Sequence, residues 1–262
     1  MQFNKLFKYT PVFKNYMHQN VNLNKNFNNN DNNHENIQLN NVFIVIAAYN
    51  EEKTIAGVIN GLKNEGYNNI IVVDDCSMDK TGLCAENSGA ITLRHIVNRG
   101  QGASLKTGID HALSNGADVI VTFDADGQHM AEDIKKLLNI LDNGYDIALG
   151  SRFIDNRSNV PLLKKIVLKC AIIFTRLTSG IKLTDTHNGL RALSRKAAKR
   201  IEIKQDRMAH ASEILDEIVK KRLSYKEAPV FIRYTSYSKR KGQSIFNSLN
   251  IAAKIMLKRL VR

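Results

Sequence analysis

The sequence has few cysteines and few aromatic residues, and each shortage argues against a class of protein. The three cysteines, at positions 76, 84 and 170, neither form an even set nor show metal-site spacing. A reduced, intracellular protein is therefore favoured over a disulfide scaffold. Aromatic residues make up 7% of the chain, and no RNA- or DNA-binding signature is present, so we expect no nucleic-acid partner. The N-terminal stretch lacks arginine and an apolar core segment, which argues against a secretory signal or a transit peptide.

Long apolar runs are missing as well. The segment 162–177 is apolar but carries four cationic residues, so it is too short and too charged to span a bilayer. It predicts an amphipathic helix that lies either on the sheet or at a membrane surface. Residues 244–262 predict a second, basic amphipathic helix with the same two alternatives. Residues 1–40 contain 13 asparagines without periodicity, which predicts a disordered leader.

The charge of the chain is unevenly distributed. Residues 1–40 have a net charge of +2, residues 41–160 of −6, and residues 161–262 of +17. Such a basic half suits an anionic membrane surface or a phosphorylated lipid better than nucleic acid, given the missing signatures. The length of 262 residues and the hydrophobic content of 43% predict one globular domain, which we place at 41–243.

Within this domain, apolar runs alternate with segments of helical spacing. The predicted strands cover 42–48, 70–73, 91–97, 118–123 and 146–150, and the predicted helices cover 51–63, 81–87, 102–115 and 131–143. This alternation predicts an α/β fold with a mostly parallel central sheet and helices on both faces. Ligands bind such sheets beyond the carboxyl ends of the strands, where the polar clusters of this chain fall.

The most specific of these clusters is the pair Asp124 and Asp126, which ends an apolar strand. Residues i and i+2 of a strand point the same way, so both carboxylates can face one ion. Hard oxygen ligands suit Mg²⁺ or Mn²⁺ carrying phosphates. An Asp-x-Asp pair is also common in plain turns, but Gly127 allows close approach of a ligand and Gln128 adds a hydrogen-bonding group. A metal site is therefore favoured.

A second acidic pair, Asp74 and Asp75, follows the strand at 70–73. A carboxylate at this place can accept hydrogen bonds from the base or the ribose of a nucleoside. Ser77 and Asp79 can instead cap the following helix. We expect one of the pair to bind the nucleoside and Asp79 to be structural.

The remaining clusters are less specific. The glycine-rich turn 98–108 leads into a helix, whose N-terminus favours phosphate, but its spacing matches neither a Walker loop nor G-x-G-x-x-G. Arg152 and Arg191 each lie beside a glycine turn, and arginine suits bidentate phosphate contacts; the alternative is a surface salt bridge. His129 and His187 are expected to be polar loop residues rather than metal ligands.

Taken in order, these segments resemble the inverting family 2 glycosyltransferases of GT-A fold, and among them the polyprenol- or dolichol-phosphate mannosyl- and glucosyltransferases. The resemblance covers about residues 42–242 and includes the glycine-rich turn at 100–108. The other segments that carry it are Ala-Tyr-Asn-Glu-Glu at 48–52, Val-Asp-Asp-Cys-Ser at 73–77, Asp-Ala-Asp-Gly-Gln-His at 124–129, Gly-Ser-Arg-Phe at 150–153, and 185–191, which begins Asp-Thr and ends Gly-Leu-Arg. Ala47 stands where such enzymes usually have proline, and Cys76 where they usually have glycine.

The resemblance implies a role for each of these positions. It implies that the nucleotide sugar is bound by Ala48, Tyr49, Glu51, Asp74, Asp75, Lys106, Asp124 and Ala125. It also implies that Asp124, Asp126 and Gln128 hold Mg²⁺ or Mn²⁺, that Asp126 is catalytic, and that Arg152 and Arg191 face an acceptor phosphate.

The sequence therefore predicts a metal-dependent inverting glycosyltransferase that moves a sugar from a nucleotide-diphosphate donor, of the GDP-mannose or UDP-glucose type, to a polyprenyl phosphate. We expect it at the cytoplasmic face of a membrane, in peripheral contact with the lipid or with a small membrane protein. The main alternative is transfer to a hydroxyl of a growing surface glycan, which needs a general base; Glu213 is the candidate. A nucleotidyltransferase is less favoured, because no glycine-rich basic loop follows the first strand.

Overall fold

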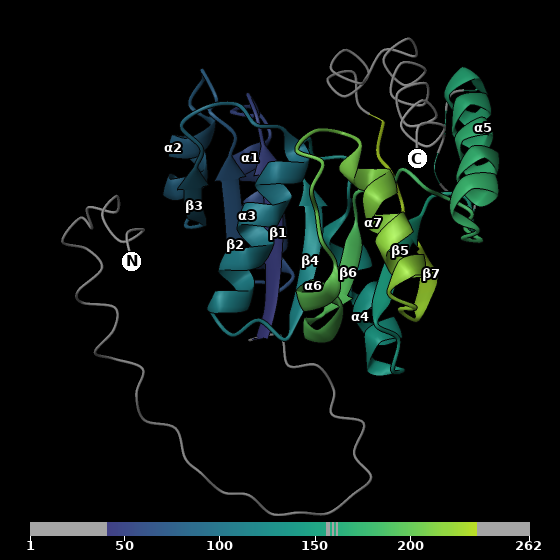
Figure 1. Ribbon diagram of the computed structural model, residues 1–262. Coiled ribbons are helices and arrows are strands. Elements are labelled where there is room, and N and C mark those ends of the chain that lie inside the picture. Colours follow the sequence, from purple (N-terminus) through teal and green to yellow (C-terminus); the bar gives the residue numbers. More distant parts are fainter. Residues whose placement is uncertain (1–40, 156–157, 159, 161, 235–262) are drawn as a thin grey trace, which may run out of the picture. The chain divides into compact units, whose positions relative to one another are not determined.

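The computed structural model describes residues 41–155, 158, 160 and 162–234. Within these residues seven strands form one sheet in the order β3-β2-β1-β4-β6-β5-β7 (Figure 1). The strands are β1 Val42–Ala48, β2 Asn69–Asp74, β3 Ile91–Arg94, β4 Val119–Asp124, β5 Ile147–Ser151, β6 Arg191–Ser194 and β7 Tyr225–Pro229. The predicted leader and the predicted helix at 244–262 lie outside the described residues, so the domain boundaries stay predictions.

The sheet is mostly parallel, as predicted, with β6 antiparallel to both of its neighbours. Strand β1 pairs with β2 and with β4 in parallel register, so that Ala48 faces Asp74 and Ala47 faces Asp124. The carboxyl ends of these strands therefore meet at one edge of the sheet, which brings the predicted polar clusters together.

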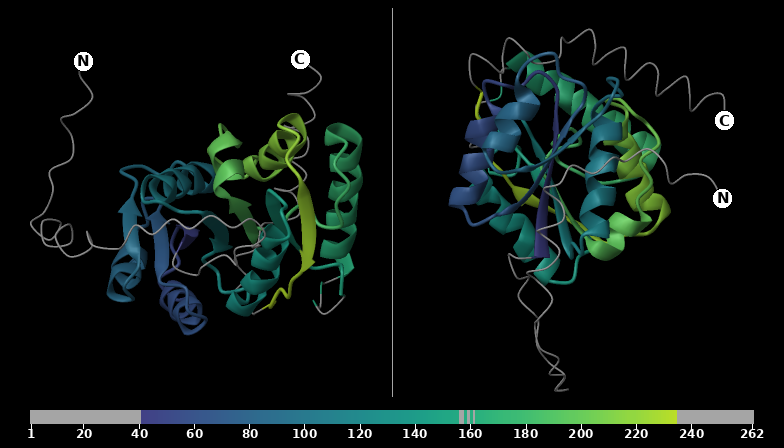
Figure 2. Two further views of the ribbon diagram at one scale, coloured as in Figure 1. Left: turned by 90° about the horizontal axis from the view of Figure 1, so that it is seen from below. Right: turned by 90° about the vertical axis from the view of Figure 1, so that its left-hand side faces the viewer.

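Helices cover both faces of the sheet (Figure 2), and an apolar layer lies between the sheet and the helices on each face. Helices α1 (Ile55–Asn64), α2 (Thr81–Asn87) and α4 (Ile134–Asp142) pack on one face, and α3 (Gln101–Ser114), α6 (Arg195–Arg200) and α7 (His210–Lys220) pack on the other. Strand residues alternate between the layers: Ile44 and Ile46 face the first, Phe43 and Val45 the second. This two-sided burial explains why β1 is a continuous apolar run.

Helix α5 (Leu162–Ser179) stands beside the β7 edge of the sheet in Figures 1 and 2. The helix has 18 residues and contacts α7. No helix among the described residues is long and apolar enough to cross a bilayer.

Several boundaries differ from the predicted ones. The helix predicted at 51–63 begins at Ile55, because residues 51–54 form a turn in which the Thr54 and Ile55 amides donate to the Glu51 carbonyl. The strand predicted at 91–97 ends at Arg94, where the amide of His95 bonds to the Asp74 carbonyl. The helix predicted at 131–143 is a 3₁₀ turn, η3 (Ala131–Asp133), followed by α4.

Candidate active site

The end of β4 carries the two carboxylates of the predicted metal site. Asp124 is the last residue of the strand, and Asp126 lies in the turn after it. The side-chain amide of Gln101 donates to one Asp124 oxygen at 3.2 Å, and Nε2 of His129 lies 2.9 Å from the other. His129 and Gln101 together fix the orientation of Asp124.

Asp126 is held by Gln128. The Gln128 backbone N–H donates to one oxygen of Asp126 at 3.0 Å, and its side-chain amide donates to the other at 2.7 Å. In the described part of the chain, no lysine or arginine forms an ion pair with Asp126. Burial raises the pKa of Asp126, and the nearby charges of Asp124 and Glu51 raise it further. Of the two carboxylates at the end of β4, Asp126 is therefore the one whose charged form is disfavoured until a cation binds.

Asp124 stays ionised more readily than its neighbour. Burial raises its pKa, but the hydrogen bond and charge of His129, with the charges of His210 and Arg191, lower it overall. Burial lowers the pKa of Arg191 to about 10 and that of His210 to about 4. At neutral pH Arg191 is therefore a cation and His210 is neutral. Of these two residues, Arg191 supplies the positive charge near Asp124 at that pH.

Gly189 lies directly against the Asp124 carboxylate. A Cβ at this position would overlap both Asp124 oxygens, and the Gly189 carbonyl accepts a hydrogen bond from Thr122 of β4 at 2.6 Å. The loop before β6 therefore reaches the metal-site carboxylate at a distance that only glycine allows. In the sequence this glycine marks a turn beside Arg191, and no local pattern indicates its contact with Asp124.

The predicted nucleotide-binding residues at the ends of β1, β2 and β4 are unequally exposed. Tyr49 is 42% exposed, whereas Ala48 and Ala125 are buried. Asp74 is fully buried, accepts from the Ser77 amide at 2.9 Å and forms an ion pair with Arg94 at 3.4 Å. These contacts give Asp74 a structural role within the turn after β2.

Asp75 holds the loop between β3 and α3. Its oxygens accept hydrogen bonds from Nδ1 of His95 at 2.8 Å and from the backbone N–H groups of Arg99 at 2.9 Å and Gly100 at 2.6 Å. Burial raises the pKa of Asp75, but these donors lower it overall. The next residue, Cys76, has a φ of 63°, a left-handed conformation that glycine adopts most easily.

The glycine-rich turn is covered by another loop. The Asp206 carbonyl accepts the Ala103 N–H at 3.0 Å, and a Cβ at Gly102 would overlap the Gln205 carbonyl. The turn is glycine-rich because residues 205–207 pack on it, so the N-terminus of α3 is occupied by the chain itself. The phosphate contact considered for this helix end is not supported by these contacts.

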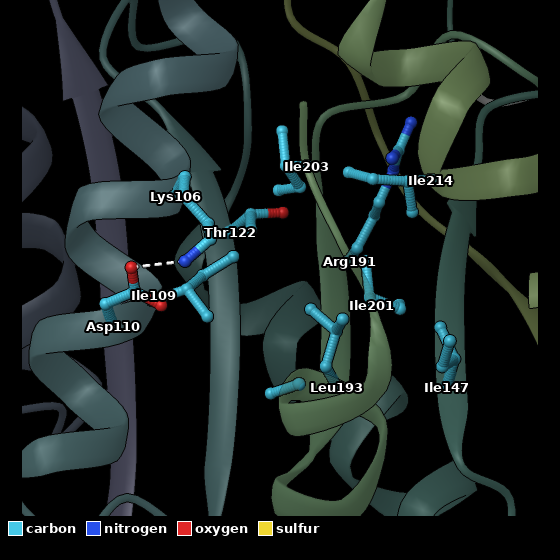
Figure 3. Close-up of a pocket in the computed structure, with 11 residues that line it drawn as sticks. Lys106, Ile109, Asp110, Thr122, Ile147, Arg191, Leu193, Ile201, Ile203 and Ile214 are labelled. Carbon is cyan, nitrogen blue, oxygen red and sulfur yellow. Dashed lines mark hydrogen bonds and ion pairs between the residues drawn. The ribbon is translucent and has the colours of Figure 1, made fainter. Parts of the chain in front are cut away.

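Lys106, a predicted nucleotide-binding residue, lies further along α3 and forms an ion pair with Asp110. Both line a pocket between α3 and β6 whose other lining residues are mostly apolar (Figure 3). Arg191 borders the same pocket, and in Figure 3 its side chain extends away from Leu193 and Ile147. The charge of Lys106 is therefore paired with a carboxylate of its own helix.

The two predicted phosphate-binding arginines are buried. Arg152 donates to Asp185 at 2.6 Å, to the His187 carbonyl at 2.8 Å and to the Tyr234 hydroxyl at 3.3 Å. Arg191 donates to the carbonyls of Asn188 at 3.1 Å and Ala211 at 3.4 Å. Neither arginine forms the surface salt bridge that was the alternative to phosphate binding, because both side chains are buried.

Glu213, the candidate general base, lies in the first turn of α7. One of its oxygens accepts the backbone N–H groups of Lys204 at 2.9 Å and Gln205 at 2.8 Å. These bonds hold the loop that covers the glycine-rich turn. Glu213 therefore acts as a loop anchor in this structure.

Comparison with known proteins agrees with this arrangement. Residues 43–202 match glycosyl transferase family 2. An uncharacterized protein of Methanocaldococcus jannaschii is 42% identical, over 86% of this chain and 94% of its own. The UDP-N-acetylglucosamine–dolichyl-phosphate N-acetylglucosaminyltransferase of Methanococcus voltae is 34% identical, over 82% of this chain and 95% of its own. A glucosyl-3-phosphoglycerate synthase structure from Mycobacterium tuberculosis, in complex with Mn²⁺, UDP-glucose and phosphoglyceric acid, has a TM-score of 0.63 at 18% identity, over 84% of this chain and 78% of that one.

The mixed sheet and the helices on its two faces define a glycosyltransferase of GT-A fold. The chain belongs to glycosyl transferase family 2. The predicted fold and enzyme class are thus confirmed, and the nucleotidyltransferase alternative is set aside.

Proposed function

We propose that this enzyme transfers a sugar from a nucleotide-diphosphate donor to a polyprenyl phosphate in a reaction that depends on a divalent cation. The observation that carries the proposal is the pair of carboxylates at the end of β4, where burial and the nearby charges of Asp124 and Glu51 raise the pKa of Asp126. No lysine or arginine of the described residues forms an ion pair with Asp126. The dolichyl-phosphate acceptor in the name of the Methanococcus voltae relative supports the choice of acceptor.

The residues at this site fit Mg²⁺ or Mn²⁺ shared with a diphosphate. Across the described ranges, no three histidine, cysteine or carboxylate side chains cluster as a self-sufficient metal site. Mg²⁺ is commonly bound by one or two carboxylates together with substrate phosphates, which is what Asp124 and Asp126 offer. When bound, such an ion would neutralise the charge that develops on the leaving diphosphate. Gln101, His129 and Gln128 keep the two carboxylates oriented.

The acceptor side favours a phosphate over a hydroxyl. A phosphate oxygen is already an anion and attacks C1 of the sugar without a base, whereas a hydroxyl must lose a proton. One oxygen of Glu213 accepts hydrogen bonds from two backbone N–H groups, which suits a role in anchoring the loop. In-line attack forms the new bond to C1 as the nucleoside diphosphate leaves, and it inverts the anomeric centre.

Arg152 and Arg191 are proposed to position the acceptor phosphate. A guanidinium has five N–H donors, and the described residues accept from three of those on Arg152 and from two on Arg191. That leaves two donors on Arg152 and three on Arg191 without an acceptor among the described residues, and both side chains are already fixed in place. Tyr49 and Glu51, at the end of β1, are proposed to contact the nucleoside together with Asp75.

A donor panel and a carboxylate variant test this function. Thermal unfolding is measured with GDP-mannose, UDP-glucose and UDP-N-acetylglucosamine, each with Mn²⁺ and with a chelator, and transfer to a polyprenyl phosphate is assayed with the stabilising donor. We expect one base to stabilise the protein in a Mn²⁺-dependent way. Asp126→Asn should abolish that stabilisation and lower transfer about a thousandfold, the scale of several kcal/mol of charge stabilisation.

The variant should not reduce stability in the absence of metal, because it removes like-charge repulsion from Asp124 and Glu51. Glu86→Gln, a change at an exposed carboxylate of α2, is the matched control and should behave as wild type. Full transfer by Asp126→Asn, or equal transfer with and without the chelator, would contradict the proposal.

A further inference from the structure

Helix α5 exposes a row of large apolar side chains along its whole length. The row, here called the α5 stripe, consists of Leu162, Ile166, Ile173 and Leu177, which are 76, 52, 60 and 81% exposed. The four are separated by four, seven and four residues, a spacing that places them on one face of a helix. On the other side of the helix, Leu168 and Thr175 are buried. The stripe is therefore a continuous apolar face turned away from the rest of the protein.

A row of cations runs beside the stripe. Lys165, Lys169 and Arg176 each follow a stripe residue by three positions, so they form the neighbouring ridge of the helix. Helix α5 contains no aspartate or glutamate, and none of the three cations has an ion-pair partner in the part of the chain that the structure describes. The charge of this ridge is thus left for a partner outside the domain.

Outside α5, the two most exposed large apolar residues of the described ranges do not line up in this way. Met78 and Ile96 are 91 and 94% exposed, but each lies in a loop. Single exposed hydrophobic residues are normal on a protein surface, whereas a contiguous apolar patch marks an interaction site. The α5 stripe is of the second kind.

We propose that the α5 stripe docks on an anionic membrane surface, with the helix in the plane of the membrane. Amphipathic helices with an apolar face and lysine or arginine beside it bind at the boundary between lipid headgroups and acyl chains. Anionic lipid strengthens this binding. With 18 residues, the helix extends about 27 Å along the surface. Anionic lipid is favoured over a second copy of this chain, because α5 has no acidic side chain. Two copies of the helix would therefore bring cations against cations without an ion pair between them.

The placement of α5 relates this surface to the site. Residues 152–161 connect the end of β5, where Arg152 lies, to the first turn of α5. Ten residues span at most about 35 Å, so docking of the helix keeps that end of the sheet within this distance of the lipid headgroups, where a polyprenyl phosphate carries its charge. In this respect the inference rests on the proposed acceptor, although membrane binding itself does not require it.

Vesicle co-sedimentation of the full chain tests the proposal. Vesicles of phosphatidylcholine alone are compared with vesicles that also contain phosphatidylglycerol. Replacing two stripe residues in Ile166→Asp/Ile173→Asp should lower binding more than tenfold, since burial of each isoleucine contributes about tenfold. The matched control, Met78→Asp/Ile96→Asp, should bind as wild type. Neutralising Lys165, Lys169 and Arg176 with glutamine should weaken binding to anionic vesicles about fivefold per cation.

A fluorophore on Cys170 reports on α5 itself. Cys170 is exposed and lies between Ile166 and Ile173 on the same face; Cys76 and Cys84 are changed to serine so that labelling is specific. Anionic vesicles should shift the emission to the blue, and the same label at Ile96→Cys, in a chain with Cys170→Ser, should not respond.

Vesicle binding without a shift at Cys170 would overturn the proposal and would point to another segment, such as 244–262. A shift without vesicles that grows with protein concentration would overturn it in favour of a second copy of the chain. Failure of the proposed function can be told apart from failure of the docking proposal. A protein that binds vesicles through α5 but transfers no sugar to polyprenyl phosphate would contradict the proposed acceptor and would leave the docking surface intact.

Discussion

The two sides of the site differ in how their charges are compensated. At the end of β4, Asp124 and Asp126 raise the local negative charge, and no lysine or arginine of the described chain forms an ion pair with either. At the end of β5, the Arg152 guanidinium is matched by Asp185 at 2.6 Å and bonded to the His187 carbonyl. On the first side Asp126 has no cationic partner among the described residues, whereas on the second side the charge of Arg152 is paired with a buried carboxylate.

This difference predicts different consequences of mutation. Where the charge is uncompensated, removal of a carboxylate should cost activity and leave stability intact, as expected for Asp126→Asn. Where a buried charge is compensated, removal of its partner should cost stability first, because an ion without a partner in a buried site is strongly unfavourable. The predictions below test this division, from the largest effect to the smallest.

Asp185→Ala should cause the largest loss of stability. Its side chain is fully buried and that of Arg152 is 7% exposed, so the variant leaves a buried guanidinium without its counter-ion. We expect the free energy of unfolding to fall by about 3–5 kcal/mol, measured by urea denaturation. Glu65→Ala breaks the exposed pair of Glu65 with Lys135 and should cost less than about 1 kcal/mol. Equal losses in the two variants would refute the division between the two sides.

Gly102→Ala should have an intermediate effect. Its Cβ would overlap the Gln205 carbonyl and lie 2.8 Å from Cβ of His210, so the loop over α3 must move. Overpacking of this kind costs about 1–3 kcal/mol. Gly61→Ala, in helix α1 with open space around the new Cβ, should instead stabilise the protein by about 0.5–1 kcal/mol. Thermal denaturation of the two variants should show shifts of opposite sign, and a shared sign would contradict the packing argument.

The sequence predicts the β1–β4 half of the sheet better than the other half. Strands β1, β2 and β4 are buried on both faces and read as apolar runs. Strands β6 and β7, with sequences Arg-Ala-Leu-Ser and Tyr-Lys-Glu-Ala-Pro, were not predicted. They are short and carry charged residues, and their place in the sheet depends on pairing with β5. No local pattern encodes that pairing.

The site shows the same limit. The carboxylates Asp124 and Asp126 were identifiable from their position after a strand, and the resemblance supplied their role. Gln101 and Asp185 were not identified as partners of Asp124 and Arg152, because those contacts join residues 23 and 33 positions apart. The sequence identifies residues that carry chemistry, whereas the residues that orient them follow from the tertiary fold.

Glu213→Gln should have the smallest effect. The glutamine carbonyl can accept both backbone N–H groups that one Glu213 oxygen accepts now, so the loop keeps its anchor. Transfer to a polyprenyl phosphate should change less than about twofold, since a phosphate acceptor needs no base. The variant is assayed beside Glu213→Ala, which removes the anchor and should lower both thermal stability and transfer. If Glu213→Gln keeps its stability but loses transfer, Glu213 is the general base and the acceptor is a hydroxyl.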